Sequence, residues 1–443
     1  MNYVISITGP EALGVLEDIC EELALPLNVT LHGRGTAVQS MLDLLGIESN
    51  EKRVVLSTAT EEKTAALIEA QKRRLHIGVP GHGIVVAVPI KSIGGGKTVA
   101  FLGGSITQGS LSSTPELCYA YLTYEWWKEQ FPKSEITYVN AGIGGTTSHL
   151  GTGRVDEEVL SHKPDFVIVE FSVNDADTDA HFEETYEGLV RRILKNEKQP
   201  ALLLVHNVRY DDGGNAEAVH CPVEKHYEVP GVSMKAAVYP FIADGRIVRR
   251  DITPDDLHPN DAGHKIVSGL ITSYLAKEKK KAEELLKEGY AFPVKETVLP
   301  APLTANGYET AHRYRNDELK PVICEGFVKD ETPQSCVADC FKKGFSAARI
   351  NDRIVFEVEA SSIAVQYRKT VRRPAPVATL ILDGDKEHTI ELNANFEEDW
   401  GDCLYLQTVL EHGEYGRHTV EITISETHED DREVFYLVSL ITA

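Results

Sequence analysis

The sequence predicts an α/β protein in three parts: an α+β part, a central part built on a mostly parallel sheet, and an all-β sandwich. A length of 443 residues by itself favours about three domains. In the centre, apolar runs alternate with helical stretches, as in parallel sheets that helices cover on both faces. The glycine-rich stretch Gly94–Lys97 precedes this region as a flexible joint, and beyond residue 290 short alternating runs replace the helices. We place the three domains at residues 1–95, 96–288 and 289–443.

The composition disfavours several classes of function. Asp and Glu number 68 against 45 Lys and Arg, so the formal charge is −23, and such a polyanion is a poor partner for nucleic acid or an anionic membrane. The sequence lacks the run of about 18 apolar residues that a membrane-spanning helix needs. The start, Met1–Ile7, has no basic region and is not typical of a signal peptide. Together with seven scattered cysteines, these features predict a cytoplasmic protein with reduced thiols.

The first part alternates strands and helices in the order of a ferredoxin-like sandwich. Strands are expected at Tyr3–Thr8, Asn28–Leu31, Arg53–Ser57 and Ile84–Pro89. Helices are expected at Pro10–Ala24, Glu61–Leu75 and, in a shorter form, Gln39–Leu45. Apart from the short helix, the predicted order is β-α-β-β-α-β.

Four segments of this part resemble P-II-type nitrogen-regulatory domains: His32–Ala37, Leu45–Ile47, Pro80–Ile84 and Pro89–Gly95. The resemblance implies a ferredoxin-like fold, a homotrimer, and adenine nucleotides bound in clefts between subunits. The lysine that follows the glycines in that family has no counterpart here before Lys91. We therefore expect the fold and the homotrimer and leave nucleotide binding open, because the glycines of these segments equally suit plain turns.

In the central part, strands are expected at Thr98–Leu102, Ile136–Val139, Phe166–Phe171, Ala201–Val205 and Ile247–Val248. Helices are expected at Tyr119–Gln130, Gly153–Leu160, Phe182–Lys195, Ser233–Tyr239 and Asn260–Ala276. The charged run Lys277–Gly289 is typical of a solvated connecting helix. Ligands of parallel sheets bind beyond the carboxyl ends of the strands, and Ser105, Gly142 and Asn174 each follow a strand closely.

Ser105 is the candidate nucleophile. It lies in the strand-to-helix turn 103–107 (Gly-Gly-Ser-Ile-Thr), where glycines let the backbone bend sharply and the helix N–H groups point at the site. A serine hydroxyl attacks only once a base takes its proton. We assign that base to His258 and the orientation of its ring to Asp255, three residues earlier. Asp256 competes for the second role, but the i,i+3 spacing favours Asp255.

Acyl transfer also requires hydrogen-bond donors for the developing oxyanion. We expect the N–H groups of Gly142 and Ser105 and the side-chain amide of Asn174 to supply them. This chemistry requires neither a metal nor a cofactor, and no His, Cys or carboxylate cluster in the sequence has the spacing of a metal site.

These blocks of serine, glycine, asparagine and histidine resemble, in type and order, the SGNH branch of the GDSL hydrolases. The resemblance implies a flavodoxin-like fold and a serine esterase. The first block, Gly-Gly-Ser-Ile-Thr-Gln-Gly, with Tyr119 and Trp126-Trp127 downstream, is similar to bacterial carbohydrate esterases, which remove acetyl groups from sugars. Ser172 stands where the third block usually has glycine, which we interpret as a subfamily variation.

The predicted function is therefore hydrolysis of small acyl esters, acetyl esters above all, on carbohydrate. One alternative is a thioesterase or lysophospholipase of the same fold, which needs a longer acyl groove. Another is a trimeric P-II-like sensor of metabolites, with the hydrolase as its output. The expected partner is an oligosaccharide ester or a small ester, without nucleic acid or membrane. His206, Trp126 and Trp127 are interpreted mainly as core or rim, and His149 and Arg154 are candidate cleft residues.

The third part has the alternating runs of a β-sandwich. Strands are expected at Ile354–Val358, Ser362–Tyr367, Val377–Leu382, Thr389–Leu392, Leu404–Leu410, His418–Ile424 and Val434–Ile441. One interpretation of Trp400, Tyr405 and Tyr367 is that they stack against sugar rings. Aromatic residues dominate sandwich cores, however, so we predict core positions for all three. Related carbohydrate esterases often carry an accessory β-domain, which keeps the sugar-stacking interpretation open.

Overall fold

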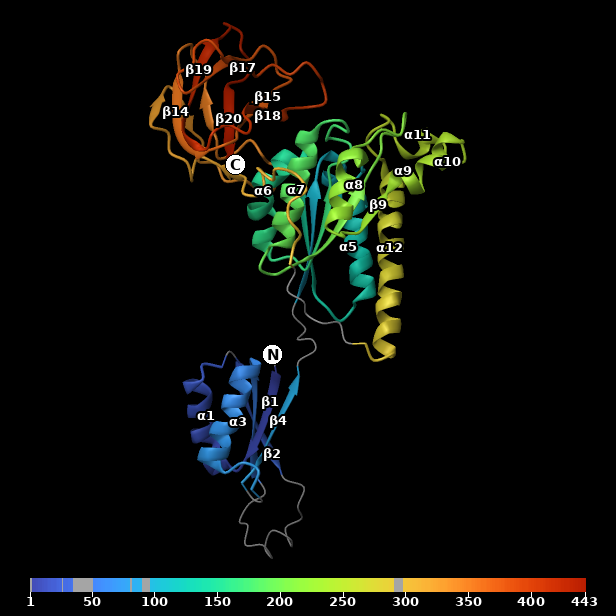
Figure 1. Ribbon diagram of the computed structural model, residues 1–443, viewed down its shortest axis with the longest axis vertical. Helices are drawn as coiled ribbons and strands as arrows, with labels where there is room; N and C mark the ends of the chain where they lie inside the picture. Colours follow the sequence, from blue (N-terminus) through green and yellow to red (C-terminus); the bar gives the residue numbers. More distant parts are fainter. Residues whose placement is uncertain (1, 26, 35–50, 80–81, 90–95, 291–297) are drawn as a thin grey trace, which may run out of the picture. The chain divides into compact units, whose positions relative to one another are not determined.

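The computed structural model describes the chain except for residues 1, 26, 35–50, 80–81, 90–95 and 291–297. It divides into two compact units, Met1–Gly95 and Gly96–Ala443 (Figure 1). The further boundary expected at residues 288 and 289, inside the second unit, stays a prediction.

The first unit is an antiparallel sheet with two helices on one face (Figure 1). Its elements are β1 (Asn2–Thr8), α1 (Leu13–Glu22, after the 3-10 turn Pro10–Ala12), β2 (Leu27–Arg34), β3 (Glu51–Ala59), α3 (Glu61–Leu75) and β4 (Ile84–Pro89). The strand order is β2-β3-β1-β4. The β-α-β-β-α-β order matches the expectation. The helix expected at residues 39–45 and most of the P-II-like motifs lie outside the described residues, so membership of that family stays a prediction.

The second unit begins with a five-stranded parallel sheet in the order β6-β5-β7-β8-β9. The strands are β5 (Lys97–Gly103), β6 (Ile136–Gly142), β7 (Phe166–Glu170), β8 (Ala201–His206) and β9 (Gly231–Ser233). Helices α5 (Tyr119–Gln130) and α12 (Asp261–Lys287) cover one face, and α6 (Ser148–Glu158) and α7 (Ala180–Leu194) cover the other (Figure 1). The register aligns Gly103 with Gly142 and with Glu170, so three strands end at one edge.

Three details of this sheet differ from the sequence prediction. The strand expected at Ile247–Val248 is wrong: this segment is irregular and Val248 is exposed, whereas β9 supplies the fifth strand through the buried Val232. Helix α8 (Glu217–His226) was not expected, because Pro222 inside it is a helix-breaking signal. The connecting helix expected at Lys277–Gly289 is the continuation of α12. Short helices complete the part: α4 (Ser105–Gln108), α9 (Met234–Ala237), α10 (Tyr239–Ala243), α11 (Arg249–Ile252) and the 3-10 turns Pro115–Leu117 and Leu160–His162.

The rest of the second unit is a sandwich of two sheets, β12-β13-β20-β15-β18, with β10 beside β20, and β11-β14-β19-β16-β17. The longer strands are β14 (Arg353–Ala360), β15 (Ile363–Lys369), β16 (Val377–Leu382), β17 (Ile390–Asn393), β18 (Cys403–Leu410), β19 (Gly416–Glu426) and β20 (Phe435–Thr442). These match the seven expected runs. The short strands are β10 (His312–Tyr314), β11 (Ile323–Glu325), β12 (Val328–Lys329) and β13 (Phe345–Ala347).

The sandwich core contains inward-facing residues of both sheets, such as Val365 and Leu437 from one and Ile354 and Val420 from the other. Among the helices of the described residues, none combines the length and the apolar character needed to cross a membrane.

Candidate active site

Ser105 is the first residue of α4, which begins directly after β5. A Cβ on Gly103 would lie 2.2 Å from Thr107 Oγ1 and 2.5 Å from the backbone oxygen of Glu170. A Cβ on Gly104 would lie 2.3 Å from Asn174 Oδ1. The two glycines are therefore required for close packing around Ser105.

His258 lies between the predicted nucleophile and the predicted acid. Its Nε2 is 2.8 Å from Ser105 Oγ, and its Nδ1 is 2.6 Å from Asp255 Oδ2. Asp255 Oδ1 accepts the backbone N–H groups of His258, at 2.7 Å, and Leu257, at 3.0 Å. This chain of contacts suits a ring that donates from Nδ1 and accepts the serine proton at Nε2.

Hydrogen bonds keep Asp255 ionised. Burial acts to raise the pKa of this carboxyl, but the hydrogen bonds from the His258 ring and from the N–H groups of His258 and Leu257 outweigh burial and hold the pKa below its usual range. An ionised Asp255 orients the imidazole and stabilises its charged form when it takes a proton.

The neighbouring Asp256 faces other partners. Its carboxylate pairs with Arg249 at 3.0 Å and with Arg250 at 2.8 Å, and its backbone oxygen accepts the N–H of Tyr210 at 2.7 Å. It adopts a φ of +68°, which directs its side chain differently from that of Asp255. The contacts therefore favour Asp255 over Asp256 as the partner of His258.

Asn260 anchors the end of the loop that carries His258. The side-chain oxygen of Asn260 accepts the N–H groups of Ala262, at 3.0 Å, and Gly263, at 3.1 Å, and so caps α12. Its amide donates to the backbone oxygen of Asp251 at 3.0 Å. His258 therefore lies between two helices, α11 and α12, that are joined through Asn260.

Gly142 is not positioned as an oxyanion donor. Its N–H donates to Asn140 Oδ1 at 2.9 Å, and a Cβ on it would lie 2.2 Å from the backbone nitrogen of Gln108. The Asn140 amide in turn donates to the backbone oxygen of Thr107 at 2.8 Å. Gly142 thus packs beneath α4 and supports the helix of the nucleophile, which corrects the role expected from the sequence.

In the loop after Gly142, Gly145 is a better candidate for the oxyanion donor than its neighbour Gly144. The Gly144 N–H is already engaged, because it donates to Gln108 Oε1 at 2.7 Å. Gly145 lines the same cavity as Ser105 and Asn174, and its N–H has no hydrogen-bond partner within the described part of the chain. The N–H of Ser105 belongs to the first turn of a helix, where N–H groups lack intrahelical partners. Gly145 was missed because several glycines follow β6 and spacing alone cannot separate them.

A cavity of about 650 Å³ lies over these groups. Ser105, Asn174, Asp255 and His258 line one side, and residues of the sandwich, including Phe341, Trp400 and Leu404, line the other. A neighbouring cavity of about 610 Å³ shares Gly145 and Leu404. The site is therefore built by both parts of the second unit.

The aromatic residues of the sandwich divide into two groups. Tyr367 is buried in the sandwich core and Tyr405 packs against it, as predicted. Trp400, in contrast, is 53% exposed and lines the cavity, and its Cη2 lies 3.3 Å from where a Cβ on Gly145 would stand. The core position predicted for Trp400 is therefore wrong, because the loop between β17 and β18 extends beyond the sandwich core.

The other candidate residues from the sequence have structural positions. Arg154 is fully buried beneath the strand ends, and His149 is buried at the neighbouring cavity, where burial and then His181 lower its pKa to about 3. Trp126 and Trp127 pack against the core of the parallel sheet. His206 is buried and its Nε2 lies 2.8 Å from Glu224 Oε2, which agrees with its interpretation as a core or rim residue.

Comparison with known proteins identifies the family and the fold. Residues 101–266 match the GDSL-like lipase/acylhydrolase family. A similar solved structure is a two-domain esterase (CEX) active on acetylated mannans, co-crystallized with mannopentaose; it is 52% identical, with a TM-score of 0.74, over 79% of this chain and 91% of that one. The chain belongs to the GDSL-like lipase/acylhydrolase family. It is a carboxylic ester hydrolase.

Two further matches extend the comparison. A second structure of the two-domain esterase (CEX) is 53% identical with a TM-score of 0.74, over 78% of this chain and 91% of that one. The thioesterase 1/protease 1/lysophospholipase L1 of Escherichia coli (strain K12) is 27% identical over 173 residues, which are 37% of this chain and 76% of that protein.

One group of side chains in this GDSL-like hydrolase has the geometry to hold a metal, among the residues that the structure describes. The ligand atoms of His206, Cys221 and Glu224 all lie within 4.8 Å of one another. None of the three residues lines the cavity of Ser105. The contacts of Ser105, His258 and Asp255 require no ion.

A buried carboxyl lies beneath the hydrolase site. Glu170, the last residue of β7, is fully buried, and its Oε1 accepts the N–H of Ser172 at 3.1 Å and its hydroxyl at 2.9 Å. Burial raises the pKa of Glu170 to about 7, against the lowering effect of the two hydrogen bonds from Ser172. Ser172, the departure from the family glycine, thus supplies a hydroxyl to this carboxyl.

Glu170→Gln is expected to remove a pH dependence of stability. Between its ordinary pKa of 4.5 and its folded pKa of about 7, folded Glu170 keeps a proton that the unfolded chain has lost, so stability falls as pH rises through this window, by on the order of 3 kcal/mol. Glutamine cannot ionise. Thermal unfolding should therefore be measured for both proteins at about pH 5 and pH 8. The unfolding temperature of the variant, relative to that of the wild type, should be higher at pH 8 than at pH 5. Parallel pH dependences would contradict the raised pKa.

Proposed function

We propose that this chain is a carbohydrate esterase that removes acetyl groups from mannan-type oligosaccharides. The observation that carries the proposal is the hydrogen-bonded series Ser105–His258–Asp255 at a cavity that the sandwich completes. The similarity to an esterase active on acetylated mannans, at 52% identity over most of both chains, supports acetylated mannan as the substrate class.

The contacts support a two-step acyl transfer. His258 Nε2 takes the proton of Ser105 Oγ as this oxygen bonds to the acetyl carbon. The tetrahedral adduct collapses, the sugar oxygen leaves with the proton from His258, and the acetyl group stays on Ser105. Water then attacks the acetyl carbon, with its proton passing to His258, and acetate leaves as Ser105 regains the proton.

We assign the oxyanion donors to the N–H groups of Ser105 and Gly145 and the side-chain amide of Asn174. All three residues line the cavity of the nucleophile. Gly142, engaged by Asn140, takes no part. Donors fixed before the reaction stabilise the charge that develops on the carbonyl oxygen, at about 3–4 kcal/mol for each donor.

The test of this function is acyl selectivity. We expect p-nitrophenyl acetate to be hydrolysed with a higher kcat/KM than the butyrate, octanoate and dodecanoate esters. A preference for long chains would instead favour the thioesterase or lysophospholipase alternative, which requires a longer acyl groove. Acetate release from acetylated manno-oligosaccharides then tests the carbohydrate part of the proposal.

Trp400→Ala is expected to weaken oligosaccharide binding without impairing the chemistry. The exposed indole beside Gly145 offers an apolar surface for the C–H face of a sugar ring. KM for an acetylated manno-oligosaccharide should rise about tenfold, equal to about 1.4 kcal/mol, while kcat for p-nitrophenyl acetate stays near the wild-type value. Tyr415→Ala, which removes another exposed aromatic residue of the sandwich, is the control. Equal effects of the two variants would contradict a specific role for Trp400.

We propose a second role for the first unit: association of copies of this chain, in line with the trimer expected from the P-II resemblance. The sheet face opposite α1 and α3 is apolar in every strand. In one row across the sheet, Ile5 pairs with Leu56 and Val86, and Leu56 pairs with Val29. Val29 is 40% exposed and Val86 is 43% exposed, and such a continuous patch is typical of an interface.

The next row of the same face repeats the pattern. Ile7 pairs with Val54 and Ile84, and Val54 pairs with Leu31. Nucleotide binding gains no support here, because a Cβ on Gly83 would lie 2.3 Å from the backbone oxygen of Ile7 and this packing already requires the glycine. Calorimetric titration with ATP, ADP and AMP tests it directly.

Leu31→Lys combined with Val86→Lys is expected to dissociate the oligomer. Two buried ammonium groups in an apolar interface cannot be solvated or paired. Light scattering after size exclusion should give three times the 48.9 kDa of one chain for the wild type and a single chain for the variant. Val248→Lys, at an exposed valine of the second unit, should change nothing. A monomeric wild type would contradict the proposal.

A further inference from the structure

A buried guanidinium ties together two strand ends that lead to the candidate active site. Arg154 of α6 is fully buried and donates to the backbone oxygen of Ala141 at 2.7 Å and to that of Gly103 at 3.0 Å. Gly103 precedes the turn of Ser105, and Ala141 precedes the loop that reaches Gly145. The position of Arg154 therefore sets the separation of the nucleophile and one oxyanion donor.

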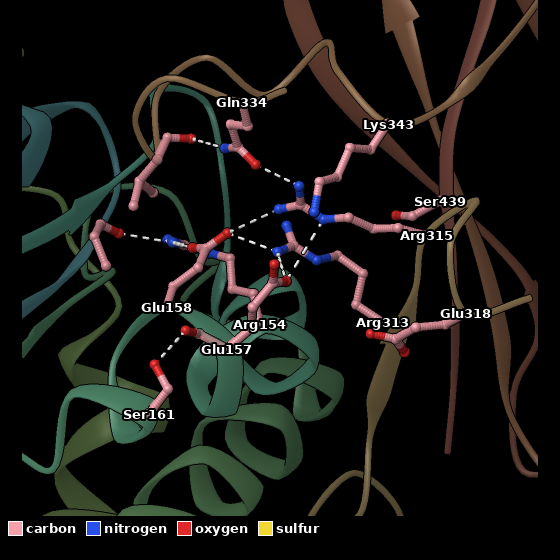
Figure 2. A network of polar contacts seen from close by, with 12 residues as sticks. Arg154, Glu157, Glu158, Ser161, Arg313, Arg315, Glu318, Gln334, Lys343 and Ser439 are labelled. Atoms are coloured by element: carbon pink, nitrogen blue, oxygen red, sulfur yellow. Dashed lines mark hydrogen bonds and ion pairs between the residues drawn. The ribbon is translucent and has the colours of Figure 1, made fainter. Parts of the chain in front are cut away.

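Arg154 is held by Glu158, one turn later on α6. Its Nη1 lies 2.5 Å from Glu158 Oε2. Glu158 Oε1 accepts a second bond, at 2.7 Å, from Arg313 of β10. Figure 2 shows the three side chains converging where the sandwich meets α6. Burial acts to raise the pKa of Glu158, but Arg154 and Arg313 outweigh burial and keep the pKa low.

Arg313 is itself fixed on both sides. It is 4% exposed, and it also donates to Glu157 at 2.6 Å. Its strand neighbour in β20 is Ile441, whose side chain lies 3.1 Å from where a Cβ on Gly153 would stand, so α6 packs directly on the sandwich. Ile143 and Leu150 join Ile441 in one apolar cluster. A side chain in such surroundings has little freedom to move away from Glu158.

We propose that Arg313 is a positioning residue of the esterase: through Glu158 and Arg154 it holds the strand ends that carry Ser105 and the Gly145 loop. The inference rests on the proposed roles of Ser105 and Gly145. It assigns to the sandwich a part in the acyl transfer itself, because a residue outside the parallel-sheet part neutralises the carboxylate on which Arg154 depends.

The charge balance explains why this contact matters. Glu158 without Arg313 is a buried carboxylate shared between Arg154 and the more distant Arg315, whose Nη2 lies 3.5 Å from Glu158 Oε1. Buried charges are costly unless well paired, so Glu158 would turn toward Arg315 or water. Arg154 would follow it, and its bonds to Gly103 and Ala141 would lengthen. A misplacement of about 1 Å at reacting groups can lower a rate about a hundredfold.

The test compares Arg313→Met with Arg353→Met in the full-length chain. Arg353 is also a strand arginine of the sandwich, paired with Glu421 at 2.7 Å, and among the described residues it has no hydrogen bond or ion pair with α6. For p-nitrophenyl acetate, Arg313→Met should lower kcat by about tenfold or more and leave KM within about twofold. Arg353→Met should leave both unchanged. Arg313→Lys, which keeps the charge, should recover part of the lost kcat.

Hydrogen–deuterium exchange supplies a readout that does not depend on substrate. The N–H of Ile143 donates to the oxygen of Gly103 at 3.1 Å, so peptides covering Ile143 and Ser105 should exchange faster in Arg313→Met and not in Arg353→Met. If Arg313→Met does not fold, Arg313→Lys replaces it in the comparison with Arg353→Met. The same changes in kcat and in exchange rate are then expected, but smaller. A folded Arg313→Met with wild-type kcat and wild-type exchange overturns the inference. A wild type without esterase activity, with the exchange pattern as expected, contradicts the proposed function alone.

Discussion

Replacing Ser105 with alanine should lower kcat for p-nitrophenyl acetate by about 10⁵-fold. The hydroxyl is the atom that bonds to the acetyl carbon, and Nε2 of His258 stands 2.8 Å from it, ready to take its proton. Alanine fits the same space, so circular dichroism and thermal unfolding should match the wild type. The oxyanion donors and the cavity would remain and account for the residual rate.

Ser110→Ala is the matched control for this experiment. Ser110 lines the same cavity but has no contact with His258 in the described structure. We expect its kcat to stay within about threefold of the wild type, as for a surface hydroxyl without a role in the reaction. An Ser105→Ala protein that keeps a substantial part of the activity would show that another nucleophile operates.

Asp255→Asn is the second large effect, with an expected loss in kcat of about 10³–10⁴-fold. An asparagine amide can no longer hold the His258 ring with its Nδ1–H toward the acid and its Nε2 lone pair toward Ser105. The loss should fall on kcat more than on KM, because the residue acts through the base and does not reach the substrate.

Asp256→Asn separates this assignment from its neighbour. Asp256 binds Arg249 and Arg250 and has a φ of +68°, a conformation that asparagine tolerates. The substitution therefore removes charge without strain, and we expect kcat to stay within about threefold. A larger loss from Asp256→Asn than from Asp255→Asn would reverse the roles.

The sequence allowed the parallel sheet and the sandwich to be predicted because both have strong local periodicity. The runs before Ser105, Gly142 and Asn174 are apolar enough to be strands whatever surrounds them. Strand β9 was missed because Gly231–Ser233 is too short to show a pattern, and it is a strand only through its pairing with β8. Helix α8 was missed because tertiary packing overrides the local effect of Pro222.

At the candidate site, the serine, histidine and aspartate could be proposed from the sequence because each residue type has a distinct role in acyl transfer. Gly142 and Gly145 could not be separated, since the difference lies in where an N–H points and in the side-chain oxygen of Asn140 that engages one of them. Trp400 could not be placed because its contact with Gly145 joins segments that are distant in sequence.

The long-range charge pairing around Glu158 could not be predicted from the sequence either. Arg154 in the sequence is one charged residue on a predicted helix, and Arg313 lies in a short strand that has no clear pattern. Their shared partner Glu158 is apparent only when α6 and β10 are brought together (Figure 2). Polar networks between segments that are distant in sequence are specified by geometry and carry almost no local sequence signal.

The most direct test of Ser105 as the nucleophile of a mannan acetylesterase is acetate release from acetylated manno-oligosaccharides by the wild type and by Ser105→Ala, followed by mass spectrometry of both protein and sugar. With the wild type we expect rapid loss of acetyl groups from the sugar and a transient gain of one acetyl group on the peptide containing Ser105. With the variant we expect neither change. Acetate release that survives in Ser105→Ala would contradict the assigned nucleophile. An active wild type that cleaves only long-chain esters or thioesters would contradict the assigned substrate.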